Sequence, residues 1–397
     1  MREVCEELFA MLPAVQEKLQ PLIGMWSMLT NALAMHTAAL DAAGLQVDRI
    51  CAGLHESTSD LCRKLAETVA SPTTEGAEQQ VALMKRTKLS CLFAGKFATL
   101  TVAVCTARHA AAPVGAEASM LEQLAEVLAL LAGVMVRLQD APAAQAAQTL
   151  ASRGAIAEAI DKALVRVLGP VADVPGDELA AAESVIMAER FLALLDPQRE
   201  PSGGTSPAVA DVARSGRFLV LLQAVHGYAG AIRNGGGRDG RAQAADGQHA
   251  TILDWIVTRI TRDDVVCASL SPPSTARHDA TLGERLVAAC GALCASWAQH
   301  DACAAQTALV GRLVLHPHPL CREVGLCVVA LVARDPGEHA QCAMLRLLVE
   351  LACWLRDRGR HQQASELVGL YATLTATLAD ERIPEPGSSA CLVVKVP

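Results

Sequence analysis

The amino-acid sequence predicts an all-α fold in which antiparallel helix pairs stack into an α-solenoid. Apolar residues recur at steps of three and four along most of the chain, the spacing that lines one face of a helix. Proline and glycine punctuate the gaps, and nothing in the first half alternates like a strand. At 397 residues the chain exceeds the usual size of one core, whereas a stack of repeats needs no single large core.

The first half of the chain supplies the clearest helical spacing. In the stretch 22–40, the spacing of one helix face is followed at steps of three and four by Leu22, Met25, Trp26, Leu29, Leu33, His36 and Leu40. Similar spacing predicts helices over 45–69, 80–106, 120–138, 156–168 and 179–195. The run DPQREPSGGTSP then combines Pro, Gly and Ser without apolar periodicity. We therefore expect an N-terminal helical repeat half over 1–195 and a linker over 196–208.

A second helical half is predicted over 209–381. It begins with a helix over 209–232 and contains two long flexible loops, near 233–248 and 270–278. Further helices are expected over 282–299, 303–315, 320–334, 338–357 and 362–378. We place Leu326 and Leu331 in the core of this half and expect a charge at either position to unfold it. The tail over 382–397 is predicted to be disordered, although an added strand is an alternative.

Composition limits the environment and the classes of partner. Early acidic residues, including Glu3 and Glu6, do not resemble a secretory signal, so we expect an intracellular protein, in the cytosol or the nucleus. The 14 cysteines are then interpreted as packing residues. The most apolar stretches, 127–136 and 325–333, are shorter than the ~20 residues of a membrane span, so no membrane insertion is expected. A net charge of −8 argues against a general nucleic-acid-binding surface.

Two sequence patterns are typical of cofactor or metal sites, but each lacks the neighbouring sequence features that such a site needs. Gly235, Gly237 and Gly240 satisfy G-x-G-x-x-G, but a helix rather than a strand precedes them, which favours a mobile loop. Potential zinc ligands gather in one region without any C-x-x-C pair. These ligands are Cys290, Cys294, His300, Cys303, His316, His318 and Cys321. We interpret them as core cysteines and turn histidines, and expect no metal and no cofactor.

No catalytic signature is found, so the chain is not expected to be an enzyme. A nucleophile elbow, a phosphate-binding P-loop and a zincin motif are all missing from the sequence. Basic residues gather in two places, of which the first comprises Lys85, Arg86, Lys88 and Lys96, and the second Arg346, Arg356, Arg358 and Arg360. A solvated face or a helix end accounts for both. The second cluster is nevertheless the candidate binding surface for an acidic partner.

Several segments resemble known helical-repeat proteins. The segment HPHPLCREVGLCVVALVARDP, 316–336, resembles a HEAT repeat helix, with a Pro-containing turn, an early Arg and an Asp-Pro stop. Together with PLIGMWSMLTNALAMHTAAL at 21–40 and VALMKRTKLSCLFAGKFATL at 81–100, it resembles the family of helical-repeat regulators of recombination and mitosis that partner the fidgetin-like AAA ATPase. Members of that family are longer than this chain, and no site residue is carried over from it.

The function that follows from these patterns is a non-catalytic protein-protein interaction scaffold. The family resemblance implies a HEAT- or armadillo-like solenoid, a nuclear location and a fidgetin-like AAA ATPase as the protein partner. It implies a role as adaptor or regulator of that ATPase in homologous recombination, DNA repair or meiosis. The same architecture also suits a trafficking or transport adaptor. A metal-dependent enzyme is a third alternative, based only on the Cys and His residues between 290 and 321.

Overall fold

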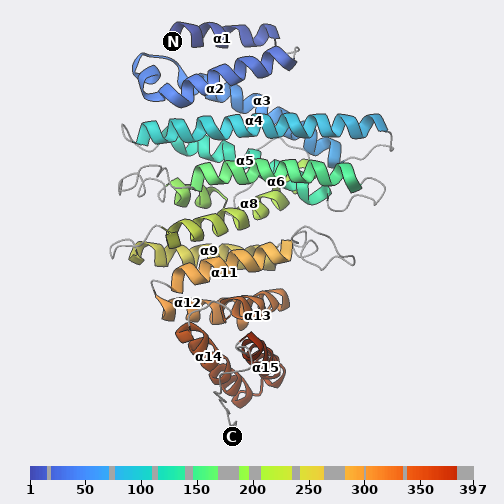
Figure 1. Cartoon of the computed structure of the whole chain (residues 1–397), viewed down its shortest axis with the longest axis vertical. Helices are drawn as coiled ribbons and strands as arrows, with labels where there is room; N and C mark the ends of the chain where they lie inside the picture. Colours follow the sequence, from blue (N-terminus) through green and yellow to red (C-terminus); the bar gives the residue numbers. More distant parts are fainter. Residues whose placement is uncertain are drawn as a thin grey trace, which may run out of the picture. The chain divides into compact units, whose positions relative to one another are not determined.

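The protein is all-α in every part that the structure describes. The computed structural model describes residues 1–15, 19–70, 77–109, 115–138, 146–168, 187–195, 207–234, 242–262, 282–298, 301–333 and 338–381. All regular elements within these ranges are helices, and none is a strand, which confirms the predicted all-α class (Figure 1). The predicted tail at 382–397 lies outside the described residues, as does the predicted loop at 270–278.

The chain forms two compact units that divide between Ala302 and Cys303. The helices of the first unit are α1 (Arg2–Val15), α2 (Leu19–Ala42), α3 (Val47–Ala70), α4 (Ala77–His109), α5 (Gly115–Arg137), α6 (Ala146–Leu168), a helix over 187–194, α8 (Pro207–Asn234), α9 (Ala242–Arg262) and α11 (Leu282–Ala298). Those of the second unit are α12 (Ala302–Leu309), a π-helical turn η3 (Val310–Val314), α13 (Pro319–Ala333), α14 (Glu338–Asp357) and α15 (His361–Glu381).

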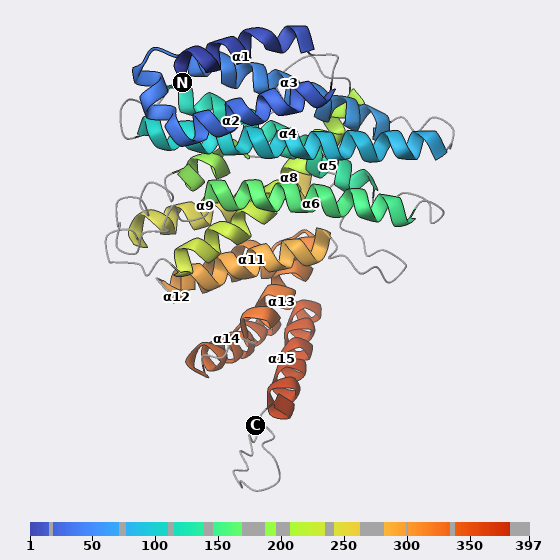
Figure 2. The ribbon, with the colours of Figure 1, turned by 45° about the horizontal axis from the view of Figure 1, so that its top comes forward.

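Helices of the first unit pack mainly against helices close to them in sequence. Contacts join α1 to α2, α2 and α3 to α4, α4 to α6, and α11 to both α8 and α9. Figures 1 and 2 show this layering, which runs through the unit in chain order. α5 lies at the centre, against α3, α4, α6 and α8, and every residue from 127 to 136 is buried. The apolar run that the sequence shows in α5 is therefore core packing.

The crossing of α5 and α8 depends on two glycines. A Cβ atom added at Gly133 would lie 1.9 Å from the carbonyl oxygen of Val212, and one added at Gly216 would lie 1.8 Å from that of Ala129. Real Cβ atoms never approach an oxygen so closely, so only glycine permits this backbone contact. The close approach links a helix before the predicted linker at 196–208 to a helix after it. The compact units accordingly divide at 302 rather than at the expected boundary.

Among the residues that the structure describes, two helices are long and apolar enough to cross a membrane by length and composition alone. They span Val81–Ala107 in α4 and Ser119–Arg137 in α5, and both exceed the shorter stretches on which the sequence prediction rested. Of the most apolar window in each, 50% and 78% respectively is buried inside the fold. The core helix of a globular protein passes the same test, so these helices do not by themselves indicate a membrane.

The second unit is built on a helical hairpin. α14 and α15 pack against each other, and α13 packs against both. Pro319 opens α13, where its missing N–H would have no partner in any case. Cys321, Val328 and Val329 are fully buried, whereas Leu331 is 45% exposed. The sequence prediction that Leu331 is a core residue is therefore wrong.

Several boundaries differ from those predicted. α1 and α9 were not expected, because the former buries few apolar side chains and the latter begins with the polar run AQAADGQH. Residues 242–248 therefore belong to a helix, although they fall within the loop predicted over 233–248. α2 is kinked at His36, whose φ of −134° is not helical. The predicted helix over 303–315 contains the π-helical turn η3.

Candidate partner-binding surface

The hairpin of α14 and α15 ends in a tight turn whose hydrogen bonds form a Schellman motif. The N–H of Arg360 donates to the carbonyl of Leu355 at 2.9 Å, and the N–H of Gly359 donates to the carbonyl of Arg356 at 3.0 Å. Gly359 has a φ of +74°, a left-handed conformation that glycine adopts without steric cost. The motif satisfies the last carbonyls of α14 and reverses the chain into α15.

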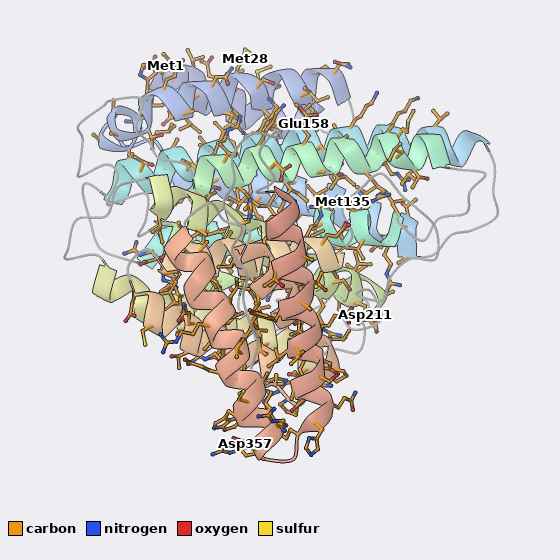
Figure 3. The ribbon with its side chains drawn as sticks, turned by 60° about the horizontal axis from the view of Figure 1, so that its bottom comes forward. Met1, Met28, Met135, Glu158, Asp211 and Asp357 are labelled. Carbon is orange, nitrogen blue, oxygen red and sulfur yellow. The ribbon has the colours of Figure 1, made fainter. Side chains whose placement is uncertain are left out.

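Basic side chains surround this turn. We define the basic tip as Arg356, Arg358, Arg360 and His361, all of which are exposed. The tip lies at the end of the hairpin, where Figure 3 labels Asp357. Asp357 is the one acidic residue between 356 and 361, and its carboxylate lies 3.9 Å from the guanidinium of Arg356, with both side chains more than half exposed. An exposed ion pair at this distance contributes little to stability.

Arg358 lies over an aromatic ring. The centre of its guanidinium is 3.9 Å from the centroid of the Trp354 ring, and Trp354 is 41% exposed. This cation–π contact holds the guanidinium over the indole while Arg358 stays exposed to solvent. Among the residues that the structure describes, neither Arg358 nor Arg360 forms an ion pair. Within the described part of the chain, the charges of Arg358 and Arg360 are therefore not neutralised.

The helix dipoles explain the positions of only two of the four residues in the basic tip. Arg356 and Arg358 lie at the carboxyl end of α14, where the partial negative charge of the helix favours cations. Arg360 and His361 lie at the amino end of α15, where the helix dipole opposes a cation. The carbonyl of Arg360 accepts the N–H of Ala364 at 3.1 Å, which makes Arg360 the N-cap, a position that favours Ser, Thr, Asn or Asp. Local stability thus does not explain its charge.

Only three of the four arginines in the predicted cluster lie near one another. Arg346 precedes Arg356 by ten residues on the same helix, a separation of about 15 Å at 1.5 Å per residue. Its guanidinium pairs with the carboxylate of Glu350 at 2.7 Å, so its charge is neutralised locally. Sequence reasoning missed Trp354 and His361 as members of this surface. The signal was present, since an aromatic residue four positions before an arginine on a helix is its neighbour.

The other basic cluster lies on α4 and faces two directions. Lys96 donates to the hydroxyl of Ser27 on α2 at 2.6 Å, and burial lowers the pKa of its amine. Arg86 donates to the hydroxyl of Thr68 on α3 at 2.5 Å. Lys85 and Lys88 are exposed. Because Lys96 points into the helix layer, it does not extend an exposed basic face.

The candidate zinc ligands do not gather into one site within the described residues. Cys290 and Cys294 are buried on α11, and burial raises the pKa of the Cys294 thiol to about 12. His316 accepts the N–H of His318 at its Nδ1 atom, at 3.0 Å, and burial together with the neighbouring His318 and Arg322 lowers its pKa. No group of three or more His, Cys, Asp or Glu residues that could hold a metal ion occurs in the described ranges.

Four of the candidate site residues from the sequence lie where the structure gives no description. Gly235, Gly237 and Gly240 of the G-x-G-x-x-G pattern fall outside the described residues, and so does His300.

A scan against protein-family models and searches of curated proteins and of solved structures found no match to this chain. The basic tip is therefore identified as the candidate site from its geometry alone.

Proposed function

We propose that this protein is a non-catalytic scaffold that binds partner proteins, and that its basic tip docks an acidic segment of a partner. The observation that carries the proposal is the unneutralised charge of Arg358 and Arg360 in a chain whose net charge is −8. A cation at the amino end of α15 costs stability, so a partner that supplies the missing carboxylates accounts for it. The exposed Trp354 adds an aromatic surface of the kind enriched in binding interfaces.

The architecture supports the scaffold reading. Successive layers of helices in the first unit follow chain order, as an α-solenoid of HEAT or armadillo type does (Figure 2). Such stacks present long surfaces to other proteins. The family resemblance of 21–40, 81–100 and 316–336 suggests the sharper form of the proposal, in which the scaffold is an adaptor for a fidgetin-like AAA ATPase in recombination, DNA repair or meiosis.

The test compares two variants with equal changes of charge. In the first, Arg356, Arg358 and Arg360 are all changed to Glu; in the second, Lys85, Arg86 and Lys88 on α4 are changed to Glu. Each tagged protein is purified from its own cells, and the bound proteins are identified by mass spectrometry. We expect the first variant to lose a defined set of partners and the second to retain it. Binding should also weaken as salt is raised, because exposed charges are screened.

The outcomes separate the alternatives. Equal partner sets for the first variant and the unchanged chain would overturn docking at the basic tip. Equal losses in both variants would mean that net charge, rather than the tip, controls binding. An AAA ATPase with recombination proteins among the partners supports the sharper form, and coat or transport proteins support the trafficking alternative instead. Recovery of no stable partner by the unchanged chain would contradict the scaffold itself.

A further inference from the structure

A cavity of about 570 Å³ lies between the first three helices. α1 contributes Phe9 and Pro13, α2 contributes Trp26, and α3 contributes Ile50 and Gly53. Figure 2 shows α1, α2 and α3 together at the amino-terminal end of the first unit. The volume falls within the range of ~300–1,000 Å³ that is typical of small-molecule sites.

Aromatic rings form the apolar part of the cavity. The rings of Phe9 and Trp26 meet edge to face, with centroids 6.4 Å apart and planes at 69°. Trp26 is only 2% exposed, and its indole Nε1 is buried without a hydrogen-bond acceptor among the described residues. The rings of Phe9 and Trp26 therefore give the cavity an aromatic, apolar wall.

A cation stands beside the same aromatic wall. The guanidinium of Arg49 lies 5.7 Å from the centroid of the Phe9 ring, and Arg49 is exposed. The lining also contains Glu6 and Glu56. Glu6 already pairs with Arg2 at 2.8 Å, and Glu56 is seven residues along α3 from Arg49, about 10 Å along the helix axis. Arg49 thus offers its charge at one end of the cavity.

Gly53 keeps the space between these walls open. A Cβ atom at this position would lie 3.2 Å from Cε2 of Phe9 and 3.6 Å from the Trp26 ring. Glycine inside a helix lowers its stability by up to about 1 kcal/mol relative to alanine. A larger side chain at this position would extend into the cavity and occupy part of it.

We propose that this cavity binds a small amphipathic anion with a flat aromatic body. The body packs against Phe9 and Trp26, and the anionic group pairs with Arg49, because a guanidinium beside an aromatic wall recognises a planar ligand that carries a carboxylate or sulfonate. The proposal is independent of the docking of proteins at the basic tip, since a different set of residues carries it.

The experiment uses two dyes that share one ring system. The anionic dye 8-anilinonaphthalene-1-sulfonate and its uncharged analogue N-phenyl-1-naphthylamine are titrated into the full chain, and the number of sites and the affinities are measured. The variant Arg49→Gln should weaken the anionic dye about tenfold and leave the neutral dye unchanged, which is the size expected for a lost charged hydrogen bond. The variant Gly53→Leu should remove one site for both dyes.

Two controls keep the result specific. Arg63 is an exposed arginine on the same helix that does not line the cavity, so Arg63→Gln should leave both dyes unaffected. Circular dichroism and thermal unfolding report whether Gly53→Leu retains the fold, and Arg49→Gln tests the site without filling it. An anionic dye that binds Arg49→Gln and the unchanged chain equally would overturn the proposal, as would a Gly53→Leu variant that folds and retains every site.

Discussion

Burial controls the reactivity of individual cysteines in this chain. Cys294 is buried on α11, and desolvation raises its pKa to about 12, whereas Cys353 is exposed on α14. At pH 8 only about one Cys294 thiol in ten thousand is ionised, and the thiolate is the reactive form. We expect iodoacetamide to label Cys353 in the folded protein and to spare Cys294, as measured by peptide mass spectrometry. Equal labelling rates would show that α11 opens readily or is not buried.

The same shift makes stability depend on pH. The pKa of Cys294 in the fold, about 12, is higher than the ~8.5 of an unfolded thiol. The folded state therefore holds a proton that the unfolded state loses above pH ~8.5. This contribution to stability is fully present below that pH and is lost as the pH rises towards 12. Urea unfolding at pH 7 and pH 10 should show the lower midpoint at pH 10.

Individual residues show where sequence patterns were sufficient and where they failed. The apolar spacing of α13 predicted a helix correctly, but it did not decide which of its many apolar residues face inward. Val328 is fully buried and Leu331 is 45% exposed, although either fits a helical stripe. A helix that is apolar on most of its surface has no single marked face, so only its neighbours decide. Arg360 was found from the sequence, whereas its position at the amino end of α15 was not.

At the scale of elements, helix existence was predictable and helix contacts were not. The spacing in α3, α5 and α15 was strong enough to predict each of them within a few residues. The contact of α5 with α8 joins residues about 80 positions apart, and local periodicity carries no information on such a pair. Its only sequence signal was Gly133 in α5 and Gly216 in α8, and glycine inside a helix commonly marks a close approach.

The crossing of α5 and α8 at two glycines leads to a specific prediction for stability. Gly133→Ala should place a Cβ atom only 1.9 Å from the carbonyl oxygen of Val212, so the two helices must separate, at a cost of about 3 kcal/mol. Gly154 on α6 has no atom within 4 Å of an added Cβ, so Gly154→Ala should be neutral or stabilising by up to about 1 kcal/mol. Urea unfolding measures both variants. A similar small gain for Gly133→Ala would mean that α5 and α8 do not approach as closely as described.

At the scale of the whole molecule, the boundary between the two compact units was the feature that the sequence predicted least well. The run DPQREPSGGTSP has the composition of a linker, yet helices before and after it share one core. The actual division, between Ala302 and Cys303, falls at the first residue of α12, just after the short break that follows α11, without any enrichment in Pro or Gly. Amino-acid composition can predict that a segment lacks regular structure. A unit boundary, in contrast, depends on which helices pack together.

Two units with separate cores should unfold separately. We expect calorimetry of the full chain to show two transitions, since each unit buries its own apolar side chains. Val328→Asp places an unpaired charge in the core of the second unit, a change that costs about 3 kcal/mol or more, and it should lower only one transition. Gly133→Ala should lower only the other. Leu331→Asp, a charge at an exposed position of the same helix as Val328, is the matched control and should move neither by more than a few degrees. A single transition that both variants shift equally would show that the two units unfold as one cooperative structure.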